Sequence, residues 1–208
     1  MSHPVVPPFG VLHVCMGNIC RSPMAERLTV VAARDLVGDK ADDLLYVHSA
    51  GTGGWHAGDP MDASAARQVR SRGGDPDGFA ARRLRGEHVD AADLVLTATA
   101  EQQQFVLSLR PDAAGRTFVL GEFGRLLGGA GRLLGGAAAV DPPSSPTPDA
   151  VHARGVALVE AVEGVRGGRP PRPGDDLDDP WGRGDRYFSR VADEIEQAVR
   201  PLVAALLS

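Results

Sequence analysis

The chain has 208 residues, 43% hydrophobic and 24% charged, which is typical of one globular domain and excludes a disordered or membrane-embedded chain. The formal net charge of −5 argues against a nucleic-acid partner, because neutralising phosphates requires a basic surface. No apolar run reaches the roughly 20 residues of a membrane span, and the first ten residues lack a secretory pattern. Two cysteines are too few for a disulfide framework. We therefore expect a cytoplasmic protein without a membrane partner.

Four short apolar runs rich in β-branched residues predict buried strands, at residues 11–14, 45–48, 94–99 and 117–120. Helical patterns lie between them, at residues 23–36, 62–72 and 101–109. For the first of these helices, Ser22 is the expected N-cap, Pro23 the first helical residue and Gly38 the stop. The alternation predicts an α/β fold with a four-stranded parallel sheet and helices on both faces, in which ligands bind at the carboxyl ends of the strands.

Residues 121–174 have a different composition. The heptad GRLLGGA occurs at 124–130 and again at 131–137, before the Pro/Ser-rich stretch DPPSSPTP. We interpret the duplication as a glycine-broken surface excursion within a single domain spanning residues 1–208. A helix is then predicted from the N-cap Thr147 to about Val165, and residues 167–174 form a loop. The last helix, which Pro201 is expected to kink, carries one apolar stripe: Phe188, Val191, Ile195, Val199, Leu202 and Leu206.

The stretch VCMGNICRSP contains both cysteines and places them between a predicted strand and a predicted helix N-terminus. Backbone N–H groups at such a turn can surround a tetrahedral anion. The helix dipole and Arg21 favour the thiolate form of Cys15, which makes it a candidate nucleophile. Arg21 can also hold two phosphate oxygens, and Ser22 can donate its hydroxyl to the thiolate. Gly17 permits close approach of the anion, and Asn18 tolerates a left-handed conformation.

CMGNICRSP at 15–23 resembles the CLGNICRSP loop of the low-molecular-weight protein tyrosine phosphatases, with Met16 as the one change. SAGTGGWHAGDPMD at 49–62, DLVLTAT at 93–99 and DPWG at 179–182 are similar to later segments of that family. The resemblance implies the family's α/β fold and a phosphatase that acts on phosphotyrosine in proteins. It also implies that the phosphate-binding loop comprises Met16, Gly17, Asn18, Ile19, Cys20, Arg21 and Ser22.

The resemblance further implies that Ser49 supports this loop and belongs with Trp55 and Trp181 to the substrate pocket. The family takes its general acid from an aspartate before proline, and this chain has four such aspartates, at positions 59, 75, 141 and 179. Asp141 is a serious rival, since it follows the fourth predicted strand. We favour Asp179, because an aromatic residue, a glycine and a long amphipathic helix follow it as in the family. The neighbouring Asp175, Asp176 and Asp178 are interpreted as a solvated acidic loop.

Cys20 lies five positions after Cys15, which leaves two interpretations open. It either forms a reversible disulfide that shields the nucleophile from deeper oxidation, or it is a small residue that fills the loop. The six histidines lack paired ligand spacing, so no metal and no cofactor are expected. His13, on the same strand face as Cys15, is expected to pack or hydrogen-bond beneath the loop.

The chain departs from the family's usual pattern at two points. Phe79 replaces a histidine that supports the loop asparagine, so Asn18 needs another partner, and Gly182 replaces a second aromatic after the acid. Two related activities stay open. An arsenate reductase of this fold would need an external thiol, and a protein arginine phosphatase would carry a threonine where this chain has Ile19, whose apolar side chain suits a phenyl ring. The physiological substrate and the oligomeric state are not predicted.

Overall fold

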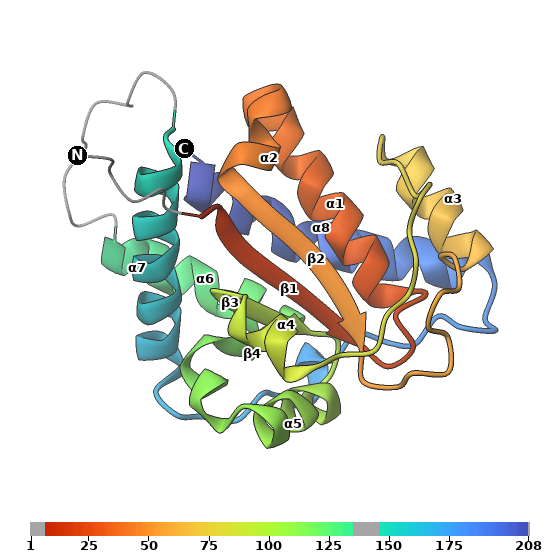
Figure 1. The fold of residues 1–208 in the computed structure, drawn as a ribbon. Helices are drawn as coiled ribbons and strands as arrows, with labels where there is room; N and C mark the ends of the chain where they lie inside the picture. Colours follow the sequence, from red (N-terminus) through yellow and green to blue (C-terminus); the bar gives the residue numbers. More distant parts are fainter. Residues whose placement is uncertain (1–6, 135–145, 208) are drawn as a thin grey trace.

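The computed structural model describes residues 7–134 and 146–207, which fold around one four-stranded sheet (Figure 1). The strands are β1 (Phe9–Cys15), β2 (Leu45–Gly51), β3 (Leu94–Thr97) and β4 (Thr117–Val119). All neighbouring strands run parallel, in the order β2-β1-β3-β4. The predicted α/β fold with a four-stranded parallel sheet is therefore confirmed.

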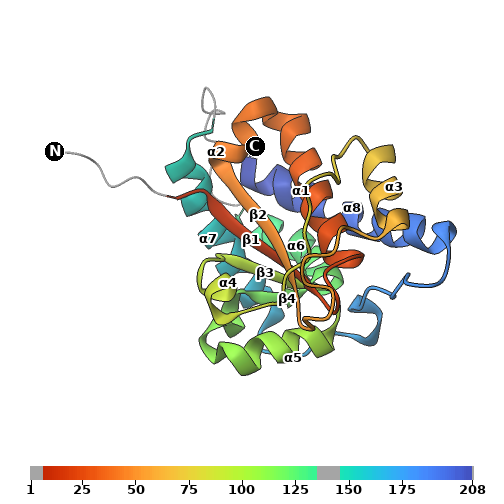
Figure 2. The same cartoon turned by 45° about the vertical axis from the view of Figure 1, so that its right-hand side comes forward.

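Helices cover both faces of the sheet (Figure 2). One face packs against α1 (Arg21–Val37), α6 (Leu120–Leu134), α7 (Pro148–Arg166) and α8 (Asp185–Leu207). The other face packs against α4 (Gly86–Asp90) and α5 (Ala100–Leu109). Because successive side chains of a strand point to opposite faces, Val11 belongs to the first core and Leu12 to the second. The first core is the larger of the two.

Short elements connect this framework. They are α2 (Ala41–Leu44), α3 (Ala63–Ser71) and the 3-10 segments Gly38–Lys40, Pro111–Arg116 and Pro173–Asp175. Helix α3 begins after Asp62, whose carboxylate accepts hydrogen bonds from the N–H groups of Ser64 and Ala65. Within the described part of the chain, no helix combines the length and apolarity needed to cross a bilayer.

Two predicted helix boundaries illustrate how local signals operate here. Helix α7 starts as predicted, with Thr147 as the N-cap that accepts from Ala150 N–H. Helix α1 ends at the predicted Gly38, which has φ 63°, but it begins at Arg21 with Cys20 as N-cap, two residues before the predicted start. The Ser22 hydroxyl is not free to cap the helix because it bonds Cys15 and Asn18 instead.

The prediction that the first GRLLGGA copy forms a glycine-broken surface excursion is wrong, because this copy lies within α6. Leu126, Leu127 and Ala130 are buried there against α7 and α8. A Cβ on Gly124 would come within 3.1 Å of Ala198 Cβ on α8, so this glycine allows the two helices to approach. Burial of the apolar stripe outweighs the low helix propensity of glycine. Residues 135–145, which include the end of the second copy and Asp141, lie outside the described residues.

Strand β1 occupies a distinctive place in the sheet. The chain leaves β1 through α1 to form β2 on one side, whereas β3 pairs with β1 on the other side. Parallel sheets bind ligands where the connections diverge in this way, beyond the carboxyl ends of the strands. The loop that begins at Cys15 lies at this position.

Candidate active site

The loop between β1 and α1 is held by the segment that follows β2. The backbone N–H groups of Thr52, Gly53 and Asp62 donate to the carbonyl oxygens of Cys15, Met16 and Ile19, each at 2.9 Å. A Cβ on Gly51 would come within 2.7 Å of Met16 O, so only glycine lets β2 pass this closely. The loop conformation therefore depends on a neighbouring strand as well as on its own sequence.

Cys15 ends β1 as a buried side chain whose Sγ lies 3.0 Å from Ser22 Oγ in the first turn of α1. Ser22 Oγ accepts a hydrogen bond from Asn18 Nδ2 at 2.9 Å, so its own hydrogen is available to an acceptor. A hydroxyl hydrogen directed at Sγ stabilises the thiolate. The arrangement permits the role expected for Ser22, which stays a prediction.

Asn18 adopts the left-handed conformation expected of it, with φ 55°, and it is the one non-glycine residue in the described ranges with a positive φ. Its side chain is fully buried and makes three hydrogen bonds. Nδ2 donates to Ser22 Oγ and to Ser49 Oγ, both at 2.9 Å, and Oδ1 accepts from Arg82 N–H at 2.8 Å. Ser49 and the Arg82 backbone thus provide the partners that Phe79 cannot.

Arg21, the first residue of α1, is 5% exposed and points into the same site. Its Nη1 donates to Leu177 O at 3.2 Å and its Nη2 donates to Asp179 Oδ2 at 2.8 Å. Its Nε is buried and has no hydrogen-bond partner within the described residues. A buried guanidinium N–H without a partner is costly, and an anion in the loop would satisfy it.

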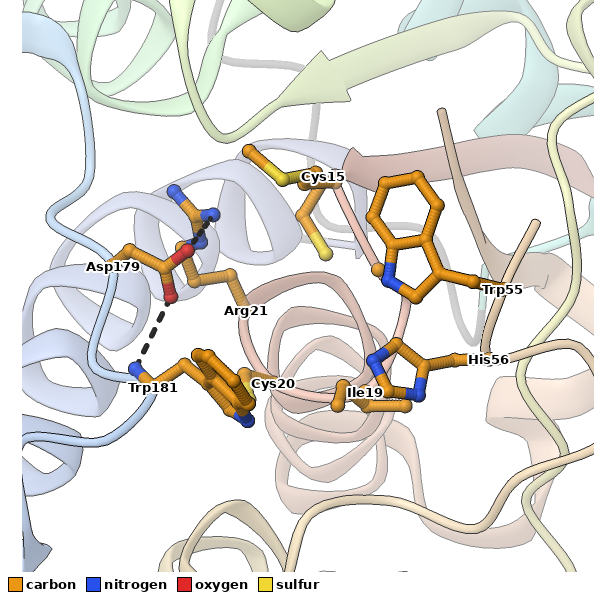
Figure 3. Close-up of a pocket in the computed structure, with 10 residues that line it drawn as sticks. Cys15, Ile19, Cys20, Arg21, Trp55, His56, Asp179 and Trp181 are labelled. Atoms are coloured by element: carbon orange, nitrogen blue, oxygen red, sulfur yellow. Dashed lines mark hydrogen bonds and ion pairs between the residues drawn. The ribbon is translucent and has the colours of Figure 1, made fainter. Parts of the chain in front are cut away.

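Asp179 lies in the segment before α8, with its carboxylate facing Arg21 (Figure 3). Its second oxygen, Oδ1, accepts from Trp181 N–H at 3.2 Å. The side chain is 47% exposed, in contrast to the buried arginine, so it can exchange protons with solvent. The structure thus brings together three residues that the sequence analysis selected: Cys15, Arg21 and Asp179.

The other acids near this sequence have their own partners. Asp175 is buried and pairs with Arg125, so its interpretation as part of a solvated acidic loop is wrong. Asp176 accepts from Ala100 N–H, and Asp178 pairs with Arg190.

The two other described Asp-Pro aspartates do not contact Arg21. Asp59 accepts a hydrogen bond from the ring of His56, and Asp75 accepts from Asp77 N–H in an exposed turn.

The loop, the Trp55 segment and the Asp179 segment enclose a cavity of about 200 Å³. Figure 3 shows Trp55 and His56 on one side of the loop and Asp179 and Trp181 on the opposite side. Trp55 and Trp181 are each about two-thirds exposed and line the cavity with apolar surface. The cavity is lined by Cys15, Met16, Gly17, Ile19, Cys20, Arg21, Trp55, His56, Asp179 and Trp181.

Three predicted site residues do not line this cavity. Asn18, Ser22 and Ser49 are buried away from it, and Asn18 donates a hydrogen bond to each of the two serines. The placement of Ser49 in the substrate pocket was therefore wrong, whereas its position fits the loop-supporting role. Cys20 lines the cavity, and burial raises the pKa of its thiol.

Sequence reasoning missed His56 and Glu26. His56 lies over Gly17, where a Cβ would come within 3.1 Å of its ring, and its Nδ1 is 2.8 Å from Asp59 Oδ2. The sequence signal was its position directly after Trp55, three residues before an aspartate. Glu26 accepts a hydrogen bond from Ser49 at 2.6 Å, and burial raises the pKa of its carboxyl. No local pattern indicated this contact.

His13 lies beneath the loop as expected, with Nε2 3.1 Å from Thr29 Oγ1. Burial lowers the pKa of His13 to about 3, so the ring is neutral. Across residues 7–134 and 146–207, no three His, Cys, Asp or Glu side chains are grouped so that they could hold a metal ion.

Comparison with known proteins finds related sequences. The low molecular weight protein-tyrosine-phosphatase YfkJ of Bacillus subtilis is 40% identical over 92 residues, which cover 44% of this chain and 56% of the relative. The low molecular weight protein-tyrosine phosphatase A of Mycobacterium bovis is 40% identical over 107 residues, which cover 51% of this chain and 63% of the relative. These alignments thus span less than two thirds of the relatives' length.

Solved structures extend the likeness over nearly the whole chain. The crystal structure of Bacillus subtilis YfkJ superimposes with a TM-score of 0.61 and 25% identity, covering 95% of this chain and 93% of that one. The tyrosine phosphatase AmsI of Erwinia amylovora has the same fold, with a TM-score of 0.62 and 20% identity over 95% and 92% of the two chains. Residues 10–130 match the family model, and with this match over more than half of its length the chain belongs to the low molecular weight phosphotyrosine protein phosphatase family.

Proposed function

We propose that the protein hydrolyses phosphotyrosine in proteins through a cysteinyl-phosphate intermediate, without a metal ion. The observation that carries the proposal is that Cys15, Arg21 and Asp179 open into one cavity at the carboxyl end of β1. These residues supply a nucleophile, an anion-binding cation and a proton donor, which together are sufficient for phosphate ester hydrolysis. The relatives named as protein tyrosine phosphatases support the same activity.

Substrate binding begins with the phosphate dianion entering the loop. The unpartnered Arg21 Nε and the guanidinium Nη2 take two of its oxygens, and Nη2 gives up Asp179 in exchange. Backbone N–H groups at the start of α1 bind the remaining charge. The released Asp179 then lies close enough to the ester oxygen to transfer a proton to it.

In the first chemical step, Cys15 Sγ attacks phosphorus and the phosphorus–oxygen ester bond breaks. Asp179 transfers its proton to the departing tyrosine oxygen. In the second step, Asp179 takes a proton from water as that water attacks phosphorus. The sulfur–phosphorus bond breaks, inorganic phosphate leaves, and the thiolate is restored with the Ser22 hydroxyl available to stabilise it.

The walls of the cavity support an aromatic leaving group. Ile19, Trp55 and Trp181 present apolar surface between the loop and the mouth, which suits a phenyl ring. Ile19 has no hydroxyl to receive a phosphoguanidinium, which disfavours a protein arginine phosphatase. An arsenate reductase would require an external thiol, because the chain contains only two cysteines. Two unpaired cysteines also fit action in the reducing cytoplasm.

Turnover of p-nitrophenyl phosphate in the presence of a metal chelator tests the activity. We expect the wild type to be active and Cys15→Ser to be inactive. Asp179→Ala should lose about 10²–10⁴-fold in kcat, as expected for removal of a general acid. Asp141→Ala is the matched control for the acid, and a greater loss in this variant than in Asp179→Ala would refute the assignment of Asp179.

Phosphotyrosine and phosphoarginine versions of one peptide test the substrate class. We expect kcat/KM to favour phosphotyrosine, because Ile19 lines the cavity with an apolar side chain that suits a phenyl ring. A preference for phosphoarginine would overturn the substrate assignment while leaving the hydrolytic mechanism intact.

A further inference from the structure

A continuous chain of hydrogen bonds leads from the cysteine sulfur to a carboxylate on α1. Cys15 Sγ lies 3.0 Å from Ser22 Oγ, which accepts from Asn18 Nδ2 at 2.9 Å. Asn18 Nδ2 also donates to Ser49 Oγ at 2.9 Å, and Ser49 Oγ donates to Glu26 Oε2 at 2.6 Å. Four hydrogen bonds thus connect Glu26 to the nucleophile, and none of the bonded side chains is exposed.

The direction of this chain is determined by its donors. Arg82 N–H can only donate, so the Asn18 atom that faces it must be the carbonyl Oδ1. The amide nitrogen Nδ2 therefore faces the two serines and donates one hydrogen to each. Each serine must offer a lone pair to Asn18 and turn its own hydrogen elsewhere.

The two serine hydrogens have different acceptors. Ser22 can direct its hydrogen to Cys15 Sγ at 3.0 Å or to Ala50 O at 3.5 Å, and a thiolate is the better acceptor. Ser49 directs its hydrogen to Glu26, and an ionised carboxylate can only accept. Without that acceptor the buried Ser49 hydroxyl would be left unsatisfied and would be free to turn away from Asn18.

We propose that Glu26 is a positioning residue for the nucleophile. It accepts the Ser49 hydrogen and thereby holds Asn18 and Ser22 in the orientation that directs a hydroxyl at Cys15 Sγ. The inference rests on the proposed function only in taking Cys15 as the nucleophile.

The surroundings of Glu26 suit this task. Its side chain is 14% exposed, and its Oε1 lies 3.6 Å from Arg27 Nε. The guanidinium of Arg82 provides a second nearby positive charge, with its Nε bonded to Ser49 O at 2.8 Å. Burial has the larger effect and raises the pKa of Glu26, whereas both cations act against it and favour the ionised carboxylate. Arg82 also holds the Ser49 backbone.

The test measures the rate at which iodoacetamide alkylates Cys15 as a function of pH, with the label located by peptide mapping. We expect Glu26→Leu, which removes the acceptor at similar volume, to react roughly five- to tenfold more slowly at pH 6, as for the loss of one ordinary hydrogen bond. The pH of half-maximal alkylation should rise. Glu26→Gln retains a carbonyl acceptor and should lie between Glu26→Leu and wild type. A purely structural role for Glu26 would leave this pH profile unchanged.

A second comparison keeps the test valid if Glu26→Leu does not fold. Ser49→Ala removes the same Ser49–Glu26 hydrogen bond by deleting its donor. Cys15 in the double variant Glu26→Gln/Ser49→Ala should therefore be alkylated no more slowly than in Ser49→Ala alone. Glu160→Gln, an exposed glutamate on α7, is the control and should retain the wild-type profile. Wild-type profiles in Glu26→Leu, or additive effects in the double variant, would overturn the inference.

Failure of this inference can be separated from failure of the proposed function. Alkylation requires no turnover, so its pH profile tests Glu26 even if p-nitrophenyl phosphate is not hydrolysed. Conversely, the wild type can hydrolyse this substrate while the Glu26 variants show the wild-type pH profile of alkylation. That result would support the proposed function and refute the positioning role of Glu26.

Discussion

At the scale of single residues, the ion pair between Arg21 and Asp179 lies where the proposed mechanism places the substrate phosphate. The pair joins two residues 158 positions apart, at 2.8 Å. An incoming dianion must displace the carboxylate, so the free protein contains a built-in competitor for its own ligand. In the proposed mechanism, the displaced Asp179 would lie beside the leaving group, which would couple phosphate binding to the supply of the proton.

This competition makes a prediction for Asp179→Asn. Removing the carboxylate charge should tighten the binding of inorganic phosphate roughly three- to tenfold, while kcat falls by about 10²–10⁴-fold. Isothermal titration calorimetry with phosphate measures the first effect. Asp178→Asn is the matched control, because Asp178 pairs with Arg190 and should leave phosphate affinity unchanged. Weaker phosphate binding in Asp179→Asn would contradict the competition.

Oxidation provides a second prediction at this scale. Both cysteines are unpaired and line the same cavity, and burial keeps Cys20 a protonated thiol by raising its pKa. Peroxide should convert the Cys15 thiolate to a sulfenic acid, and Cys20 would then displace water from it to form a disulfide. We expect dithiothreitol to restore wild-type activity, and Cys20→Ser to lose activity irreversibly. Mass spectrometry distinguishes the outcomes, and a sulfonate at Cys15 of the wild type without a 15–20 linkage would refute the disulfide.

At the scale of elements, glycines in helices have opposite roles according to what they face. A Cβ on Gly155 of α7 would come within 2.3 Å of the buried Phe9 ring, whereas one on Gly164 of the same helix would meet nothing within 4 Å. The first glycine permits α7 to pack on β1. Gly164 has no such packing role and only lowers the helix propensity of α7.

The corresponding prediction concerns two alanine variants. Gly155→Ala should reduce the free energy of unfolding by about 1–3 kcal/mol, because the overpacked Phe9 ring cannot move without disturbing the core. Gly164→Ala is the matched control and should increase it by roughly 0.5–1 kcal/mol. Urea unfolding followed by circular dichroism measures both. Stabilisation by Gly155→Ala would show that α7 is not held against Phe9 as the structure has it.

At the scale of the whole molecule, buried histidines couple folding to pH. Burial lowers the pKa of His13 to about 3 and that of His48 to about 4. In the unfolded chain both titrate near 6.5, so below that pH the unfolded state binds protons that the folded state does not. Stability is therefore lost as the pH falls from about 6.5 towards 4.

We predict that the unfolding free energy depends on pH with different slopes in the wild type and in His48→Gln. Between pH 4.5 and 6, the unfolding free energy of the variant should depend on pH less steeply by about 1 kcal/mol per pH unit, because the two states differ by slightly less than one bound proton in this range. Burial raises the pKa of Glu26 and Glu122, which acts in the opposite direction but equally in both proteins. Urea unfolding across this range measures the slopes, and above pH 7.5 they should be equal. Equal slopes below pH 6 would contradict a neutral, buried His48.

Much of the fold could be predicted because its signals are local. The apolar runs placed all four strands, and capping residues such as Thr147 and Gly38 placed helix ends. The prediction from glycine content was wrong at α6. The glycine-rich repeat indicated a broken surface segment, whereas its leucines are buried against α7 and α8. Propensity describes an isolated segment, whereas the free energy of a helix in a protein comes mainly from the surface that it buries.

The sequence by itself determined the position of the candidate anion-binding loop, because Cys15 and Arg21 lie within one strand-to-helix turn. Only the tertiary structure decided which distant groups meet this loop. Asp179 reaches Arg21, Ser49 and Glu26 support Asn18, and His56 covers Gly17. The physical reason is range: a turn is specified by neighbouring residues, whereas a hydrogen bond across many residues depends on how the sheet and its helices pack.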